Sequence, residues 1–363
     1  MQLSTKRTFW VDAVRVTAML LVLLNHSLEH VFALNTAEEW MSYTPPMRYF
    51  STFVFGIGRL GVPLFLFLTG YLILSKKMDS YEEIIHFYKH NLLSMVITME
   101  IWIIIMSFYL RMINPTYSLK QILLTMIFWK QVDSMQMWYA PFIVGTYLGL
   151  PFLKCIVSHI PNKIIGIYLG VLTILDLCFP IMHIFYTFNE PDLLKNVLWG
   201  SGYNSYVILY LIAGYFLGNN YINLISKIPI YFWIATGVIL FVINWYTQCL
   251  AYSCGHDAKF GYQSITAFLS SICLFVILKK IFEQISISEV LEKVINRLSQ
   301  VSFGAFFLHT IVQDMLLKVS FICVKSHVIQ VFLLWIVSVA ITYTICLFIK
   351  KNSAAGKLLL NIK

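Results

Sequence analysis

The sequence predicts an all-α, polytopic membrane protein with about ten transmembrane helices. Hydrophobic residues make up 59% of the chain and charged residues only 12%, whereas soluble domains are about 25% charged. Apolar stretches of about 20 residues, long enough to cross the hydrocarbon core of a bilayer, recur along the whole chain. No stretch of comparable size is polar enough to form a soluble domain, so residues 1–363 are predicted to form a single membrane domain.

Short polar breaks such as Lys76-Lys77 separate the expected spans. The two weakest candidates are 203–219, which is short and polar, and 299–320, which contains two titratable residues. The ten expected spans are 9–34, 51–75, 91–112, 138–157, 164–184, 203–219, 229–251, 263–282, 299–320 and 328–349.

The distribution of Lys and Arg predicts the orientation in the membrane. With ten spans, both termini lie on one side, and sixteen of the 26 Lys and Arg residues fall on that side. Eight fall on the other side, while Arg15 and Arg59 lie inside spans. The positive-inside rule therefore predicts cytoplasmic termini. The net charge of +9 reflects this bias and contact with anionic membrane lipids, and it does not indicate a nucleic-acid-binding surface.

The first expected span carries charged and titratable residues at membrane depth. Such residues are unfavourable in a span and usually face the bundle interior or a water-filled cavity. At about 100° per residue, Arg15 and His26 lie within roughly 20° of each other, and all five polar residues share a stripe roughly 100° wide. This face is typical of a polar track through a membrane helix; the alternative is that its end residues extend into the headgroups. The five are Asp12, Arg15, His26, Glu29 and His30.

The second expected span, 51–75, contains Arg59 and Pro63 near its outer half. An Arg at this depth needs a carboxylate, a carbonyl or an anionic ligand, unless it extends to the outer headgroups. Pro63 is expected to kink the helix and to free backbone carbonyls. Thr69 and Gly70 form a small surface that lets a neighbouring helix approach closely.

Three residues further along are candidates for lining a substrate cavity. Trp138 and Tyr139 open the fourth expected span from the outside, where an aromatic belt at the membrane interface is the alternative explanation. His309 lies on an otherwise apolar helix, and a single intramembrane His can instead bond a neighbouring Ser or carbonyl.

The seven cysteines show no metal or redox spacing, so no metal site is predicted. Cys249 and Cys254 flank the outer end of the seventh expected span, where a disulfide between them is possible. The sequence contains no Gly-rich phosphate loop, no zinc motif and no nucleophile elbow.

Four segments resemble, in this order, the acyltransferase family 3 membrane proteins, which are bacterial enzymes that O-acylate surface carbohydrates. The most specific match is Asp12-x-x-Arg15, followed eleven residues after the Arg by His26. The run that begins at Arg59, Arg-x-x-Val-Pro-Leu-Phe, is also informative. Length and layout are similar to members that O-acetylate enterobacterial common antigen or succinylate a biofilm polysaccharide. The segments are FWVDAVRVTAMLLVLLNH, RLGVPLFLFLTGYLIL, MWYAPFIVGTYLGLPFL and SFGAFFLH.

The resemblance implies an integral membrane acyltransferase of the bacterial cytoplasmic (inner) membrane. Such an enzyme takes an acyl group, usually acetyl, from acyl-CoA at the cytoplasmic face and passes it to a hydroxyl of a surface or lipid-linked carbohydrate. It needs no bound cofactor, since acetyl-CoA or another acyl-CoA is its donor substrate. The family's essential His corresponds to His26, its first-span Arg to Arg15 and its second-span Arg to Arg59. The matches of Trp138 and His309 are weaker.

The residues themselves suit acyl transfer. An alcohol is a poor nucleophile at neutral pH, and an imidazole, with an ordinary pKa near about 6.5, is a suitable base. His26, Glu29 and Asp12 are therefore the predicted catalytic residues, with Glu29 placed to stabilise a protonated imidazole. Arg15 lies about 16 Å from His26 along the helix, where its guanidinium can bind a phosphate of acyl-CoA. Asp12 is expected to orient Arg15, and Arg59 is the second candidate for binding acyl-CoA or another anion.

Two mechanisms and a different functional class stay open. His26 can deprotonate the acceptor hydroxyl for direct transfer, or it can carry the acyl group as an acyl-imidazole. A polar stripe in a ten-span bundle is also typical of a transporter or flippase for a glycan or small metabolite. The sequence shows no clear inverted repeat and no paired broken helices in matching halves, which favours the enzyme. A membrane assembly factor without chemistry is the third alternative.

Overall fold

The computed structural model confirms an all-α membrane protein. Within the ranges it describes, the chain forms helices and no strand. Seven helical segments, two of which join consecutive helices, are long and apolar enough to cross a membrane: Phe9–Val31, Pro45–Leu74, Tyr81–Ile113, Tyr139–His159, Ile230–Ser253, Ile265–Gln284 and His327–Ile349. The described residues are 9–114, 118–130, 134, 136–178, 206–219, 227–257, 261–285 and 287–362.

The other three expected spans each overlap a helix, so the count of ten stays a prediction. α11 (Tyr206–Gly218) is apolar but has only 13 residues. α9 (Asn162–Thr173) continues as the π-helix η2 (Ile174–Cys178), and residues 179–184 of that expected span lie outside the described residues. α15 (Glu289–Leu316) begins well before its expected start, with exposed charged turns that hydropathy alone excludes from a span.

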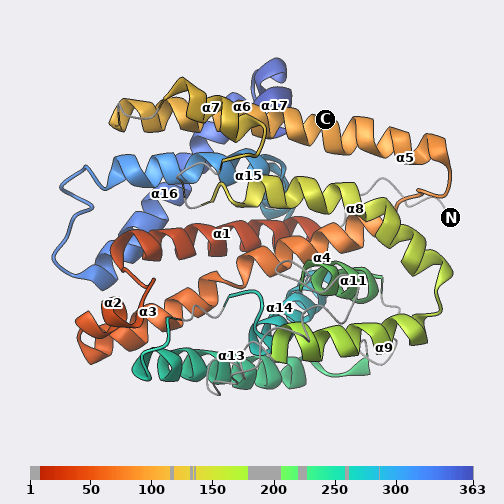
Figure 1. The fold of residues 1–363 in the computed structure, drawn as a ribbon, viewed down its shortest axis with the longest axis horizontal. Helices are drawn as coiled ribbons and strands as arrows, with labels where there is room; N and C mark the ends of the chain where they lie inside the picture. Colours follow the sequence, from red (N-terminus) through yellow and green to blue (C-terminus); the bar gives the residue numbers. More distant parts are fainter. Residues whose placement is uncertain are drawn as a thin grey trace. The chain divides into compact units, whose positions relative to one another are not determined.

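The chain divides into two compact units, and each unit combines two segments that are far apart in sequence. Unit 1 comprises Met1–Lys76 and Ile156–Ser288, and unit 2 comprises Lys77–Cys155 and Glu289–Lys363. In Figure 1 the helices of unit 1 are red to orange and green to cyan, whereas those of unit 2 are orange to yellow and blue. That residues 1–363 form a single domain stays a prediction.

Unit 1 is organised around α1 (Phe9–Val31), which packs against three other helices. These are α3 (Pro45–Gly58), α4 (Gly61–Leu74) and α14 (Ile265–Gln284). α13 (Ile230–Ser253) packs against α3 and α14, and α11 packs against α4. Most residues of α1 between Trp10 and Leu28 are buried, as expected for a helix that carries polar groups inside a bundle.

Unit 2 contains the remaining long helices. α15 packs against α16, and the short C-terminal helix α17 packs against α6, α15 and α16. The Trp102 indole of α6 donates a hydrogen bond to the Leu359 carbonyl of α17 at 2.8 Å, which attaches the C-terminal helix. The helices of this unit other than α15 are α5 (Tyr81–Phe87), η1 (Tyr88–Leu92), α6 (Leu93–Ile113), α7 (Leu119–Met126), α8 (Tyr139–His159), α16 (His327–Ile349) and α17 (Ser353–Leu360).

Glycines let α4 and α11 pack backbone against backbone. A Cβ added at Gly70 would overlap the carbonyl oxygen of Leu211, and one added at Gly214 would overlap that of Phe67. Membrane helices use small residues in this way because lipid provides no hydrophobic drive for their association. The expectation that Gly70 admits a neighbouring helix is confirmed.

Gly70→Ala is expected to destabilise the protein by about 1–3 kcal/mol, because a methyl group must enter a fully packed contact. Gly166→Ala in α9 is the matched control, since nothing lies within 4 Å of its added Cβ. Ala is a better helix former than Gly, so the control should be neutral or stabilising. Thermal unfolding followed by intrinsic fluorescence in detergent measures both, and equal unfolding temperatures would contradict the close α4–α11 contact.

The second expected span consists of two helices, because α3 ends at Gly58 and α4 begins at Gly61. Pro63 has no N–H to bond the carbonyl of Arg59, which lies four residues earlier, so a continuous helix loses a hydrogen bond here. Both glycines pack on α1: added Cβ atoms would lie 2.6 Å from the Asn25 Cβ and 2.7 Å from a backbone oxygen of α1. The helix is thus interrupted close to Pro63, and the interruption holds Arg59 close to α1.

The structure shows that one possible disulfide is not formed and that one lysine is buried. Cys249 and Cys254 are both free; Cys249 is buried with its Sγ 3.1 Å from the Thr52 hydroxyl, so the possible disulfide is not formed. Lys279, one of the sixteen Lys and Arg residues assigned to the side of the termini, is only 5% exposed. Its Nζ donates to the carbonyl of Leu217 at 3.0 Å and to that of Gly218 at 2.7 Å, which caps the C-terminus of α11.

Candidate active site

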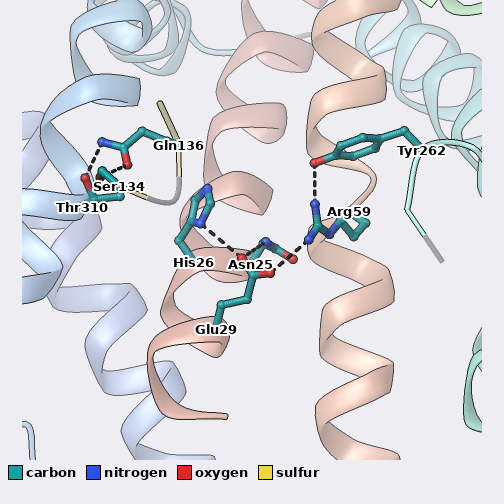
Figure 2. Close-up of polar contacts among 8 residues, drawn as sticks. All are labelled: Asn25, His26, Glu29, Arg59, Ser134, Gln136, Tyr262 and Thr310. Atoms are coloured by element: carbon teal, nitrogen blue, oxygen red, sulfur yellow. Dashed lines mark hydrogen bonds and ion pairs between the residues drawn. The ribbon is translucent and has the colours of Figure 1, made fainter. Parts of the chain in front are cut away.

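Glu29 is the centre of a buried polar cluster in unit 1 (Figure 2). Its Oε1 lies 3.0 Å from Nη2 of Arg59. Its Oε2 accepts a hydrogen bond from Nδ2 of Asn25 at 2.8 Å and lies 3.3 Å from Nδ1 of His26. The side chains of Glu29 and Arg59 are only 13% and 18% exposed, so each charge depends on the other for compensation.

The periodicity of α1 explains half of this cluster. Residues three and four apart are neighbours on a helix surface, so Glu29 faces both His26 and Asn25 from the same helix. Arg59 comes from the break between α3 and α4, where the glycines bring the chain onto α1. Asn25 was not among the predicted residues, although its position four residues before Glu29 was a usable signal.

Arg59 has a second polar partner, Tyr262, in the segment between α13 and α14. Nη1 of Arg59 donates a hydrogen bond to the phenol oxygen at 3.1 Å. The guanidinium carbon also lies 4.5 Å from the centre of the Phe55 ring, within the range of a cation–π contact. Burial raises the pKa of the Tyr262 phenol and the nearby Arg59 opposes part of that rise, so the phenol stays protonated at neutral pH. No sequence signal distinguished Tyr262 from the other tyrosines.

A second ion pair lies toward the Phe9 end of α1. Nη1 of Arg15 is 3.5 Å from Oδ1 of Asp12, and the two side chains are 23% and 3% exposed. The expectation that Asp12 contacts Arg15 is confirmed. Because Arg15 precedes Glu29 by fourteen residues, it lies about 21 Å from that residue along the helix. Arg59, proposed with Arg15 as an anion-binding residue, therefore lies with Glu29 instead, and its predicted anion binding is untested.

His30, the fifth polar residue of the stripe, lies in the last turn of α1, directly after Glu29. It belongs to the same end of α1 as His26. The structure thus divides the predicted residues of α1 into two groups, a cluster around Glu29 and the pair of Asp12 and Arg15.

Trp138, Tyr139 and His309 belong to unit 2, where Phe306 connects them. The Trp138 ring centre lies 5.7 Å from that of Tyr139, which lies 4.9 Å from that of Phe306. His309, one turn further along α15, is fully buried, and its Nδ1 donates to the Ala305 carbonyl at 3.2 Å. The alternative that His309 bonds a carbonyl is confirmed, and its role in a substrate cavity stays a prediction.

Gln136, which was not predicted, fixes the segment before Trp138 to α15. Its buried amide group donates to the Phe307 carbonyl. It also donates to the Thr310 hydroxyl and accepts a hydrogen bond from Ser134 (Figure 2). A buried amide whose donors and acceptor are bonded is a structural anchor.

Comparison with known proteins identifies the family. The family model for acyltransferase family 3, described as an acyltransferase domain, matches residues 8–351. The chain belongs to acyltransferase family 3. No curated protein and no solved structure matches the chain, so the likeness to members that act on enterobacterial common antigen or a biofilm polysaccharide stays a prediction.

In this acyltransferase the cluster around Glu29 can orient an imidazole base. A carboxylate that faces Nδ1 of His26 favours the tautomer with its proton on that nitrogen. Nε2 is then the atom that can accept a proton or attack an acyl carbon. In the part of the chain that the structure describes, no three His, Cys, Asp or Glu side chains are grouped so as to hold a metal ion.

Proposed function

We propose that the protein is an O-acyltransferase that moves an acetyl group from cytoplasmic acetyl-CoA to a hydroxyl of a surface or lipid-linked carbohydrate. The observation that carries the proposal is the polar face of α1, where the cluster of His26, Glu29 and Arg59 and the pair of Asp12 and Arg15 occupy different turns. The proposed location is the bacterial inner membrane, with both termini in the cytoplasm.

Arg15 is the proposed contact for the donor. Its guanidinium is the more exposed partner of the pair with Asp12, and guanidinium groups bind phosphates through two parallel hydrogen bonds. Arg15 lies about 16 Å from His26 along α1. A phosphate held at Arg15 would allow an extended pantetheine arm to bring the thioester toward His26.

His26 is the proposed base for the acceptor. In direct transfer, Nε2 takes the proton of the sugar hydroxyl while the hydroxyl oxygen bonds to the thioester carbon. The C–S bond breaks, and CoA leaves as a thiolate that is then protonated. In the two-step route, Nε2 bonds to the acyl carbon while the C–S bond breaks and CoA leaves as a thiolate. The sugar oxygen then bonds to the same carbon, the C–Nε2 bond breaks, and the hydroxyl proton goes to the thiolate or to the released imidazole. Labelled acyl-enzyme trapped without acceptor, and absent from His26→Ala, would establish the second route.

The family match adds no support to the transporter or flippase alternative. Purified protein supplied with labelled acetyl-CoA tests the choice directly. Transfer to a carbohydrate acceptor, or slow release of acetate without one, is expected. A wild-type protein that neither binds acetyl-CoA nor consumes it would contradict the enzyme.

Arg15→Gln is expected to weaken acetyl-CoA binding by at least about tenfold, since a hydrogen bond to a charged group contributes about 1.5–3 kcal/mol. Arg15→Lys keeps the positive charge near Asp12 and should have an intermediate effect. Calorimetric binding of acetyl-CoA measures both variants, with Arg297→Gln as the control at an exposed position. Unchanged affinity in Arg15→Gln would exclude Arg15 as the donor contact.

A further inference from the structure

We infer that Tyr262 is a positioning residue, which fixes the Arg59 guanidinium and thereby the orientation of the Glu29 carboxylate toward His26. This inference rests on the proposed function, because the positioned groups are those assigned to acyl transfer. It concerns unit 1 alone, to which all four residues belong.

The first step is the geometry of the guanidinium. Arg59 uses Nη1 for the Tyr262 phenol at 3.1 Å and Nη2 for Oε1 of Glu29 at 3.0 Å. The guanidinium is a rigid planar fork, so partners on both terminal nitrogens fix the orientation of its plane. Its partners come from different elements, since Glu29 lies on α1 and Tyr262 precedes α14.

The second step is that Tyr262 is itself held in place. Its backbone carbonyl accepts a hydrogen bond from the fully buried Tyr210 hydroxyl of α11 at 3.0 Å. Its ring stacks on that of Tyr206, with 6.3 Å between ring centres and 29° between planes. A phenol attached to α11 in this way is a rigid reference for Arg59.

Contacts of the end of α13 and of the residues that follow it attach this region near the Val31 end of α1. The Tyr252 hydroxyl donates to the Leu34 carbonyl at 2.7 Å, and Oδ1 of Asp257 accepts from the Ala37 N–H at 2.7 Å. Residues that precede Tyr262 along the chain are therefore attached to neighbouring elements, which supports a fixed position for its phenol.

Loss of the phenol oxygen would leave Arg59 with its charge partner but without its second fixed bond. The guanidinium can then rotate while it still pairs with Glu29, and the carboxylate can follow it away from His26. Misplacement of a catalytic group by about 1 Å lowers rates by as much as about 10²-fold. The charges of the cluster are unchanged, so the effect would be one of orientation.

Tyr262→Phe removes only the hydroxyl and keeps the stacked ring. We expect kcat to fall by about tenfold to a hundredfold, with KM for acetyl-CoA unchanged because the pair of Asp12 and Arg15 lies at the other end of α1. Tyr246→Phe, at a 64% exposed position on α13, is the matched control and should behave as wild type. Combined with Arg59→Gln, Tyr262→Phe should add little further loss, because both changes remove the same contact.

A labelling experiment tests the contact without relying on activity. Phenylglyoxal modification of Arg59, followed by mass spectrometry, should be several-fold faster in Tyr262→Phe than in wild type or Tyr246→Phe. A wild-type kcat in Tyr262→Phe, additive losses in the double variant, or unchanged labelling would each overturn the inference. A wild-type protein without transferase activity would instead overturn the proposed function, and the labelling rates would still decide the role of Tyr262.

Discussion

His26→Ala is expected to lower the rate of acyl transfer by about 10²- to 10⁴-fold, which is the usual contribution of a general base. The imidazole is the side chain in the cluster around Glu29 that can take a proton from a hydroxyl and release it again. Initial rates of transfer from labelled acetyl-CoA, with purified protein in lipid nanodiscs, give the measurement. Binding of acetyl-CoA should be retained, since Arg15 is untouched.

The control for this substitution is His159→Ala, which removes an exposed imidazole at the end of α8. It should leave the rate unchanged. If His26→Ala retained more than about a tenth of the wild-type rate while it stayed folded, the imidazole would not be the base.

Glu29→Gln is expected to be the most destabilising single change in the cluster, by about 3–5 kcal/mol, because it leaves a buried Arg59 without a compensating charge. It should also reduce transfer strongly, since the carboxylate that faces His26 is lost. The double variant Glu29→Gln with Arg59→Gln removes both charges. It should recover most of the lost stability and none of the lost activity.

Thermal unfolding and transfer rates of the two variants separate charge balance from catalysis. Parallel recovery of stability and activity in the double variant would mean that Glu29 acts only by balancing Arg59. No recovery of stability would mean that the two side chains do not depend on each other in the folded protein.

Contacts within one helix could be predicted from the sequence. The spacing of three residues between Asp12 and Arg15, and between His26 and Glu29, follows directly from helix periodicity, and both contacts are present. Pro63 likewise predicted the break in the second expected span, because the missing N–H is a property of that residue alone.

Contacts between helices could not be predicted in the same way. Arg59 reaches Glu29 across 30 residues and Tyr262 across 203, and nothing in the local pattern selects those partners. The residue type of Arg59 indicated only that a counter-charge or an anion was needed. Which of these it meets depends on how α3 and α4 pack on α1, and packing is decided by the whole of unit 1.

Hydropathy also could not show whether a charged side chain is exposed or buried inside the protein. The count that predicts the orientation includes Lys279 by its position alone. The structure shows this side chain buried, where it caps carbonyls at the end of α11. Hydropathy also missed the true start of α15. It detects only the apolar part of this helix, whereas the helix begins in charged turns before that part.

The glycines on either side of Arg59 have a consequence for how this region can change in evolution. Gly58 and Gly61 each touch α1, so the chain between them spans a fixed interval of the α1 surface. One inserted residue would turn the following helix by about 100° and shift it by about 1.5 Å. The number of residues in this connection is therefore more strictly constrained than the identity of the half-buried Leu60 within it. Length, more than composition, is what related chains have to keep here.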